Sequence, residues 1–156
     1  MYEQDTTRLA DEIVRFIRMG TRFRGMLKTG DLGAEFSALM LLFPLSEQGP
    51  MRITDLAEVK GADPSTVSRQ AAQLVKAGLA RREADPDDGR ASRLAVTERG
   101  SDACRHLHHT RHALLSSVLS DWPQERIDLF VDLFAHFNSS VEELLRSPSI
   151  APREKV

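Results

Sequence analysis

Apolar residues recur every three or four positions along most of the chain, which is the spacing of amphipathic helices. Residues 5–28 follow this pattern, with charged residues between the apolar ones, and predict a first helix. Residues 34–42 are apolar on most sides and predict a buried second helix. We expect Pro44 to end or kink that helix, because proline lacks the backbone N–H and clashes with the preceding turn. A loop is expected at residues 46–50.

Two short helices joined by a tight turn are predicted next, at residues 54–60 and 65–77. Asp63 suits the N-cap of the second of these helices, and Pro64 suits its first position. Gly78 stands where a helix C-terminus favours glycine. These signals together predict a helix-turn-helix.

The pattern then changes to two segments short enough to be strands, residues 79–84 and 91–96. Between them, residues 85–90 are rich in turn-forming side chains. We therefore expect a two-stranded hairpin with a polar tip.

Two further helices are predicted toward the C-terminus, the first from residue 98 to about residue 119. Asp121, Trp122 and Pro123 interrupt the pattern before a last helix begins. The apolar residues of that last helix alternate in steps of three and four, the seam spacing of helices that pack lengthwise: Ile127, Phe130, Phe134, Phe137, Val141 and Leu144. A second row widens this apolar face, with Val131, Leu133 and Leu145. The seam requires a partner, either within the chain or in a second copy.

Length and composition fit one globular domain. The chain has 156 residues, of which 41% are hydrophobic and 28% charged. Apolar runs stay far below the roughly 20 residues of a membrane helix, and the first residues are acidic. We expect a cytoplasmic protein without a membrane partner.

The single cysteine, Cys104, has no internal disulfide partner. A buried, inert thiol is the favoured interpretation, and a redox sensor is the alternative.

Charge is unevenly distributed, although the net charge is only −2. Residues 65–82 contain no acidic side chain, whereas nearly all the charged residues within 121–145 are acidic. The positive charge of the middle segment comes from Arg69, Lys76, Arg81 and Arg82. This distribution favours a nucleic-acid surface in the middle of the chain.

The predicted helix 65–77 suits a DNA major groove, which admits one helix. Its predicted outward residues carry hydroxyls, amides and one guanidinium: Ser65, Thr66, Ser68, Arg69, Gln70 and Gln73. Arginine can pair with guanine edges and glutamine with adenine edges, while hydroxyls near the helix start suit phosphates. At the hairpin, Arg90 is the candidate for the minor groove or backbone, with Arg93 as a second candidate.

Five segments of the chain also resemble one known family. They are Ile53–Glu58, Ser65–Arg69, Lys76–Arg82, Asp85–Ala91 and Leu94–Gly100. In these residues the chain resembles the multiple-antibiotic-resistance regulator (MarR) family, and the flanking helices match the layout of that family in number and order.

The resemblance implies a mainly α fold with a small β-hairpin wing, in one MarR-like domain over residues 1–156. Residues 34–100 would form the winged helix-turn-helix, and residues 5–28 and 101–146 would form interleaved dimerisation helices. It implies further that Asp88 pairs with Arg90 to support the wing.

The chain departs from the family pattern at three positions. Gly89 stands where arginine is frequent, Arg52 stands where a small hydroxyl cap is common, and Pro44 is unusual in the second helix. The first departure predicts a weaker wing contact, and the second predicts a different start of the first helix of the helix-turn-helix.

The family typically binds small aromatic or phenolic ligands between its dimerisation helices and its DNA-binding part. Candidate lining residues are Phe16, Phe23, Phe36, Met40 and Phe43, although simple core packing is the favoured interpretation for most of them. His108 and His112 lie one helical turn apart and are candidate zinc ligands, but a solvated helix face is the favoured interpretation. No cofactor and no metal are therefore predicted.

The function predicted from the sequence is a ligand-responsive repressor that binds a palindromic operator in double-stranded DNA as a homodimer. The alternative is a small-molecule or zinc sensor of the same fold that has lost specific DNA binding. Enzymatic activity is not expected, because the sequence contains no glycine-rich phosphate loop, nucleophile elbow or two-histidine zinc motif.

Overall fold

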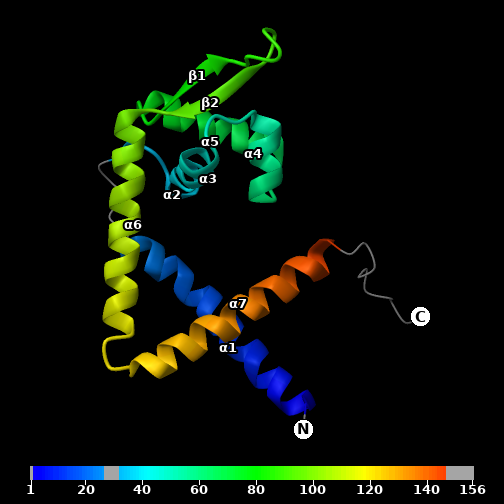
Figure 1. The fold of residues 1–156 in the computed structure, drawn as a ribbon, viewed down its shortest axis with the longest axis vertical. Helices are drawn as coiled ribbons and strands as arrows, with labels where there is room; N and C mark the ends of the chain where they lie inside the picture. Colours follow the sequence, from blue (N-terminus) through cyan, green and yellow to red (C-terminus); the bar gives the residue numbers. More distant parts are fainter. Residues whose placement is uncertain (1, 27–31, 147–156) are drawn as a thin grey trace, which may run out of the picture. The chain divides into compact units, whose positions relative to one another are not determined.

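The computed structural model describes residues 2–26 and 32–146 (Figure 1). Its elements, in chain order, are α1 (Tyr2–Met26), α2 (Phe36–Leu39), α3 (Leu42–Gln48), α4 (Ile53–Lys60), α5 (Pro64–Lys76), β1 (Ala80–Ala84), β2 (Ser92–Val96), α6 (Glu98–Val118) and α7 (Gln124–Arg146). The chain divides into two compact units, residues 1–112 and 113–156. In the described part, no helix is long and apolar enough to cross a membrane.

The predicted hairpin is confirmed, and it packs on the helix-turn-helix (Figure 1). β1 and β2 are antiparallel, with Ala80 opposite Val96 and Ala84 opposite Ser92. Met51 adds an isolated bridge to Leu94, which ties the segment before α4 to the hairpin. Helix α5 contacts β1, α2 and α4. The core of the first unit, residues 1–112, consists mainly of leucines, among them Leu39, Leu42, Leu56, Leu74, Leu79 and Leu94.

The boundaries of α5 follow from local signals, as predicted. The Asp63 carboxylate accepts hydrogen bonds from the backbone N–H groups of Ser65 and Thr66, at 2.8 and 3.3 Å. Pro64 occupies the first turn, where its missing donor has no cost. Gly78 follows the helix with a φ of 70°, a left-handed conformation that glycine adopts without strain.

The prediction for residues 34–50 was wrong in two respects. Pro44 neither ends nor kinks a helix from its interior: the break falls earlier, at Met40 and Leu41, and Pro44 lies in the first turn of α3, where a backbone N–H would lack an intrahelical partner anyway. The buried segment is therefore split into α2 and α3. The loop expected at residues 46–50 begins only after Gln48, because α3 extends to that residue.

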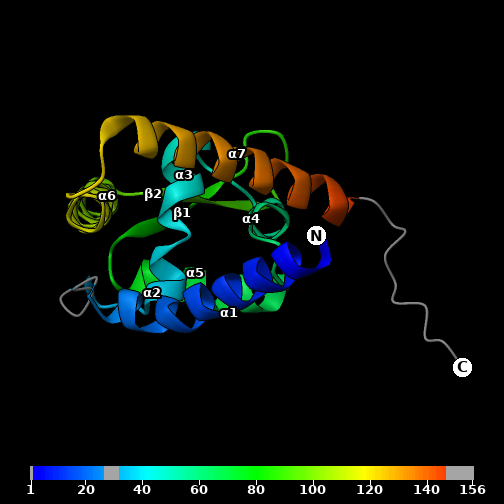
Figure 2. The ribbon, with the colours of Figure 1, turned by 90° about the horizontal axis from the view of Figure 1, so that it is seen from below.

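Helix α7 follows α6 after a turn at residues 119–123 (Figure 2). It has 23 residues, and none of them is buried. The side chain of Phe134, in the middle of the predicted seam, is 47% exposed, and Leu145 is 81% exposed. Trp122 in the turn packs edge-on against Phe130, which in turn stacks on Phe134. The predicted apolar face of α7 is therefore present, and its large side chains are largely exposed within the described residues.

Candidate nucleic-acid interface

One face of α5 is buried and the opposite face is exposed. Val67, Ala71 and Leu74 pack into the core. The exposed line on the opposite side runs through Ser65, Arg69, Ala72 and Lys76, in steps of four, three and four. This line contains two cations and no acidic side chain.

The structure places most of the predicted reading residues at or beside this line. Ser65 and Arg69 are exposed, and Thr66, Ser68 and Gln70 are half-buried. The Arg69 guanidinium donates to Thr66 Oγ1 at 3.3 Å, so Arg69 lies back along the helix toward its N-terminus. Gln70 Oε1 is buried and has no hydrogen-bond partner within the described residues.

Gln73, which was also predicted to point outward, is half-buried and makes a contact within the chain. Its side-chain oxygen accepts a hydrogen bond from the backbone N–H of Glu35 at 3.2 Å. Glu35 is the N-cap residue of α2 and makes no side-chain cap of its own. Gln73 therefore connects α5 to the start of α2.

Two exposed residues were missed when the reading face was predicted, Ala72 and Lys76. Their helical spacing from Arg69 would have revealed them. Lys76 lies seven residues after Arg69, which is about two helical turns, so both cations project from one side of α5.

The wing tip is closed by backbone hydrogen bonds. The N–H of Asp85 donates to the carbonyl of Ala91 at 3.0 Å, and the N–H of Ala91 donates to the carbonyl of Asp88 at 2.9 Å. The Asp88 carboxylate accepts from the backbone N–H of Arg90 at 3.0 Å. Contact between Asp88 and Arg90 thus runs through the main chain. The Arg90 side chain is exposed, and it forms no ion pair with any described residue.

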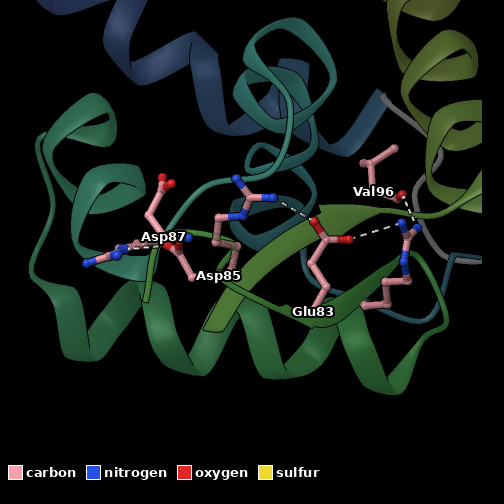
Figure 3. A network of polar contacts seen from close by, with 7 residues as sticks. Glu83, Asp85, Asp87 and Val96 are labelled. Carbon is pink, nitrogen blue, oxygen red and sulfur yellow. Dashed lines mark hydrogen bonds and ion pairs between the residues drawn. The ribbon is translucent and has the colours of Figure 1, made fainter. Parts of the chain in front are cut away.

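Glu83 lies between two guanidinium groups on one face of the hairpin (Figure 3). It pairs with Arg81 on its own strand and with Arg93 on the opposite strand, both at 3.1 Å. Arg81 also donates to the carbonyl of Val96 at 3.1 Å. Arg93, the second wing candidate for DNA contact, is therefore already engaged by a carboxylate within the hairpin.

Arg52 and Asp85 form an ion pair between the start of α4 and the base of the wing tip (Figure 3). Arg52 Nε lies 2.6 Å from Asp85 Oδ2, and the other carboxylate oxygen accepts from the backbone N–H of Asp87 at 2.9 Å. These two hydrogen bonds, that from Arg52 first, hold the pKa of Asp85 below its usual value. Arg52 is the N-cap residue of α4, and its side chain makes no cap hydrogen bond there. That this residue changes where the helix starts stays a prediction.

The C-terminus of α5 is fastened to the N-terminus of α6. Thr97 Oγ1 donates to the carbonyl of Gly78 at 2.7 Å, and Arg99 donates to the carbonyl of Ala77 at 2.6 Å. Carbonyl groups at a helix end have no intrahelical partner, so these donors satisfy groups that would otherwise face solvent. The position of α5 is consequently tied to that of the long helix α6.

Aromatic and cationic side chains meet where α3 and α6 approach each other. The ring of His108 contacts that of Phe43 edge-on, with centroids 4.6 Å apart, and the Arg111 guanidinium lies 5.7 Å from the Phe43 centroid. Phe36, Met40 and Phe43 are half-buried, whereas Phe16 is exposed on α1. The side chain of Phe23, also a candidate pocket residue, lies outside the described residues.

The two candidate sensing sites, Cys104 and the His108/His112 pair, lie in different environments. Cys104 is buried, and this burial raises the pKa of its thiol, which favours the unreactive protonated form. His108 Nδ1 lies 2.9 Å from an Arg111 nitrogen. Over residues 2–26 and 32–146, no three histidine, cysteine or acidic side chains gather closely enough to hold a metal ion.

Comparisons with known proteins agree with this geometry. The model of the MarR family matches residues 36–92. An uncharacterised helix-turn-helix transcriptional regulator of Bacillus subtilis strain 168, YxaD, is 33% identical over 142 residues, which are 90% of this chain and 98% of the relative.

Solved structures share the fold at lower identity. A MarR family protein from Bacillus stearothermophilus superposes with a TM-score of 0.76 at 19% identity, over 89% of this chain and 97% of that one. RV1404 from Mycobacterium tuberculosis gives a TM-score of 0.74 at 22% identity, over 88% and 94% of the two chains. The residues quoted for the resemblance, the winged helix-turn-helix and these relatives agree, and the chain belongs to the MarR family of transcriptional regulators.

Proposed function

We propose that the protein regulates transcription by binding double-stranded DNA, with α5 in the major groove and the wing tip against the adjacent minor groove or backbone. The observation that carries this proposal is the exposed face of α5, which presents Ser65, Arg69 and Lys76 without an acidic side chain. Such a face offers hydrogen-bond donors and positive charge to a polyanion.

Each residue of the interface has a distinct proposed role. Arg69 reads a guanine edge, because its guanidinium can donate two parallel hydrogen bonds to that base. Ser65, at the helix N-terminus, and Lys76, near its C-terminus, contact phosphates and set the register of α5. Thr66, Ser68 and Gln70 flank the same groove.

The wing contributes mainly through Arg90, which is exposed at the tip. Arg93 is the weaker candidate, because it would have to leave Glu83 in order to reach DNA. Asp88 supports Arg90 through the main chain and does not neutralise its guanidinium.

We propose that the protein acts as a homodimer that binds a palindromic operator. The exposed apolar seam of α7 offers a surface for a second copy, and so, separately, do exposed apolar residues of α1 such as Phe16 and Ile17. Large exposed apolar faces are rare on monomeric soluble proteins. Two copies would present two α5 helices to half-sites about one helical turn apart.

We propose further that a small aromatic ligand controls DNA binding, and that the protein represses transcription without it. Half-buried Phe43 contacts His108, and this pairing of an apolar ring with a polar group suits an aromatic ligand with one polar group; half-buried Phe36 and Met40 are further candidates for its apolar contacts. The alternative, a sensor that has lost DNA binding, is disfavoured by the acid-free exposed line of α5.

A mobility-shift titration with the DNA upstream of the protein's own gene tests the proposal. We expect a shifted band that survives excess random duplex of the same length and base composition. The logarithm of the binding constant should fall with the logarithm of the salt concentration with a slope steeper than about −4, because several phosphates are contacted per dimer. A protein that binds neither its upstream DNA nor random duplex would support the alternative.

A further inference from the structure

Arg52 occupies an unusual place for an arginine, the N-cap position of α4. An N-cap side chain usually accepts hydrogen bonds from the first backbone N–H groups, and a guanidinium has no acceptor. In this chain the side chain turns away from α4 and donates to Asp85, which lies 33 residues later. The first helix of the helix-turn-helix thus gives up a side-chain cap while gaining a link to the wing.

Asp85 receives this link at the point where β1 ends and the wing tip begins. Its side chain is only 4% exposed, and it is the buried charged residue of the described core. Both carboxylate oxygens are used, one by Arg52 and one by the backbone N–H of Asp87 inside the tip. Because a buried carboxylate requires a partner, the tip is held at one position relative to α4.

We propose that Arg52 is a positioning residue for DNA binding. Through Asp85 it holds the wing tip, and therefore Arg90, at the height and angle at which Arg90 meets DNA while α5 lies in the major groove. This inference rests on the proposed function, since it concerns how the DNA-binding surface is kept in register. It assigns to Arg52 an effect on DNA affinity that does not require Arg52 itself to touch DNA.

A competing account is that Arg52, whose side chain is 39% exposed, contacts a phosphate directly. The two accounts predict opposite effects of Asp85→Asn on DNA affinity. Removing the carboxylate charge would free Arg52 and add positive field, so direct contact predicts tighter DNA binding. The positioning account predicts weaker binding, because the wing tip loses its charged anchor while the amide oxygen still accepts from Asp87.

The experiment is a double-mutant cycle on full-length protein with its upstream DNA, comparing Arg52→Ser, Arg90→Ala and the double variant. Serine restores an N-cap hydroxyl, which offsets part of the stability lost with the ion pair, and thermal unfolding checks that Arg52→Ser is folded at the temperature of the binding assay. We expect this variant to bind about fivefold more weakly, in the range found for residues that act through a coupled network. In the Arg90→Ala background the same change should have no further effect, because the contact that Arg52 positions is already absent.

Three results would overturn the inference: a loss that remains about fivefold in the Arg90→Ala background, tighter binding by Asp85→Asn, or no loss in Arg52→Ser. A salt slope that becomes less steep by about one when Arg52→Ser is added to Arg90→Ala would also indicate a direct phosphate contact, because Arg90 is already absent there. These results leave the proposed function intact, because wild-type protein still binds DNA in each. Absence of binding by the wild type would overturn the proposed function, and this inference with it.

Discussion

Gly100, in the first turn of α6, lies directly against the carbonyl group of Leu79, the residue that precedes β1. A Cβ added at Gly100 would come within 1.9 Å of the Leu79 oxygen and 2.9 Å of its carbonyl carbon. The neighbouring Thr97 hydroxyl accepts from the Gly100 N–H and donates to the carbonyl of Gly78, so this close approach fixes how α6 meets the end of α5.

The first prediction is that Gly100→Ala destabilises the protein by about 1–3 kcal/mol or more, because backbone has to shift to admit the methyl group. Thermal unfolding followed by circular dichroism measures this loss. Gly89→Ala is the matched control, since no atom lies within 4 Å of a Cβ there. Equal stability of the two variants would contradict the close approach.

The second prediction concerns the N-cap of α5. Asp63→Ala should lower the melting temperature by several degrees, because two backbone N–H groups and the Ser65 hydroxyl lose their acceptor. Asp63→Asn, which keeps an acceptor oxygen, should retain most of the stability. If alanine and asparagine were equally harmful, charge and not capping would be the dominant contribution.

The third prediction is a pH dependence of stability. The pKa of Asp85 is lowered by its hydrogen bond from Arg52, and the pKa of Asp63 is lowered by its bonds from Ser65 and Thr66. A carboxyl group whose folded pKa is depressed stabilises the fold at pH values above its unfolded pKa, near 4. That stabilisation is lost as the pH falls below about 4 and through the folded pKa. Chemical unfolding at a series of pH values should show this decline.

Asp85→Asn is the variant that tests the origin of the decline. It should be less stable than wild type at pH 7 and should lose less stability on acidification, because one of the two titrating groups is gone. A decline as steep as that of the wild type would assign the acid sensitivity to other carboxylates.

The fourth prediction separates base reading from phosphate contact on α5. Arg69→Ala should weaken specific binding by about 1–3 kcal/mol and relax preference at one base pair of each half-site. Lys76→Ala should weaken binding to all sequences alike and make the salt slope less steep by about one for each phosphate that is no longer neutralised. Arg126→Ala, which removes an exposed cation from α7, is the control and should leave both quantities unchanged.

The fifth prediction concerns the seam of α7. Phe134→Glu places a charge in the middle of the apolar face, and it should shift the protein from dimer to monomer and abolish operator binding. Sedimentation velocity measures the mass, and emission from Trp122, which packs on Phe130, should shift to longer wavelength. Ser139→Glu, on the acidic side of the same helix with Asp128 and Asp132, should remain dimeric. A dimer in both variants would place the interface elsewhere.

Local signals in the sequence were sufficient for most of the fold. Asp63, Pro64 and Gly78 mark the ends of α5 through interactions that span only a few residues, and their effects were predicted correctly. The hairpin followed in the same way from turn-forming residues between two short apolar segments. The prediction for Pro44 was wrong because proline interrupts a helix from its interior but is tolerated in the first turn, and the sequence pattern did not show which of these positions Pro44 occupies.

Tertiary contacts explain what the sequence could not provide. Gln73 belongs to the polar side of α5 by composition, but the N-terminus of α2 packs beside it and offers the backbone N–H of Glu35. Likewise, the sequence revealed Arg52 as a departure from the family pattern but not its partner, because Asp85 is distant along the chain. Pairings of this kind depend on how β1 and α4 are placed, which no local pattern encodes.

The exposed apolar face of α7 has a consequence for how stability depends on protein concentration in the cell. An isolated helix in water is only marginally stable, and α7 contributes no buried residue to its own chain. If two copies pair through α7 as proposed, its order is acquired when they meet, and resistance to heat and proteolysis rises with protein concentration. On that proposal, dilution alone would weaken binding to the proposed operator, and gene expression would depend on the abundance of the regulator.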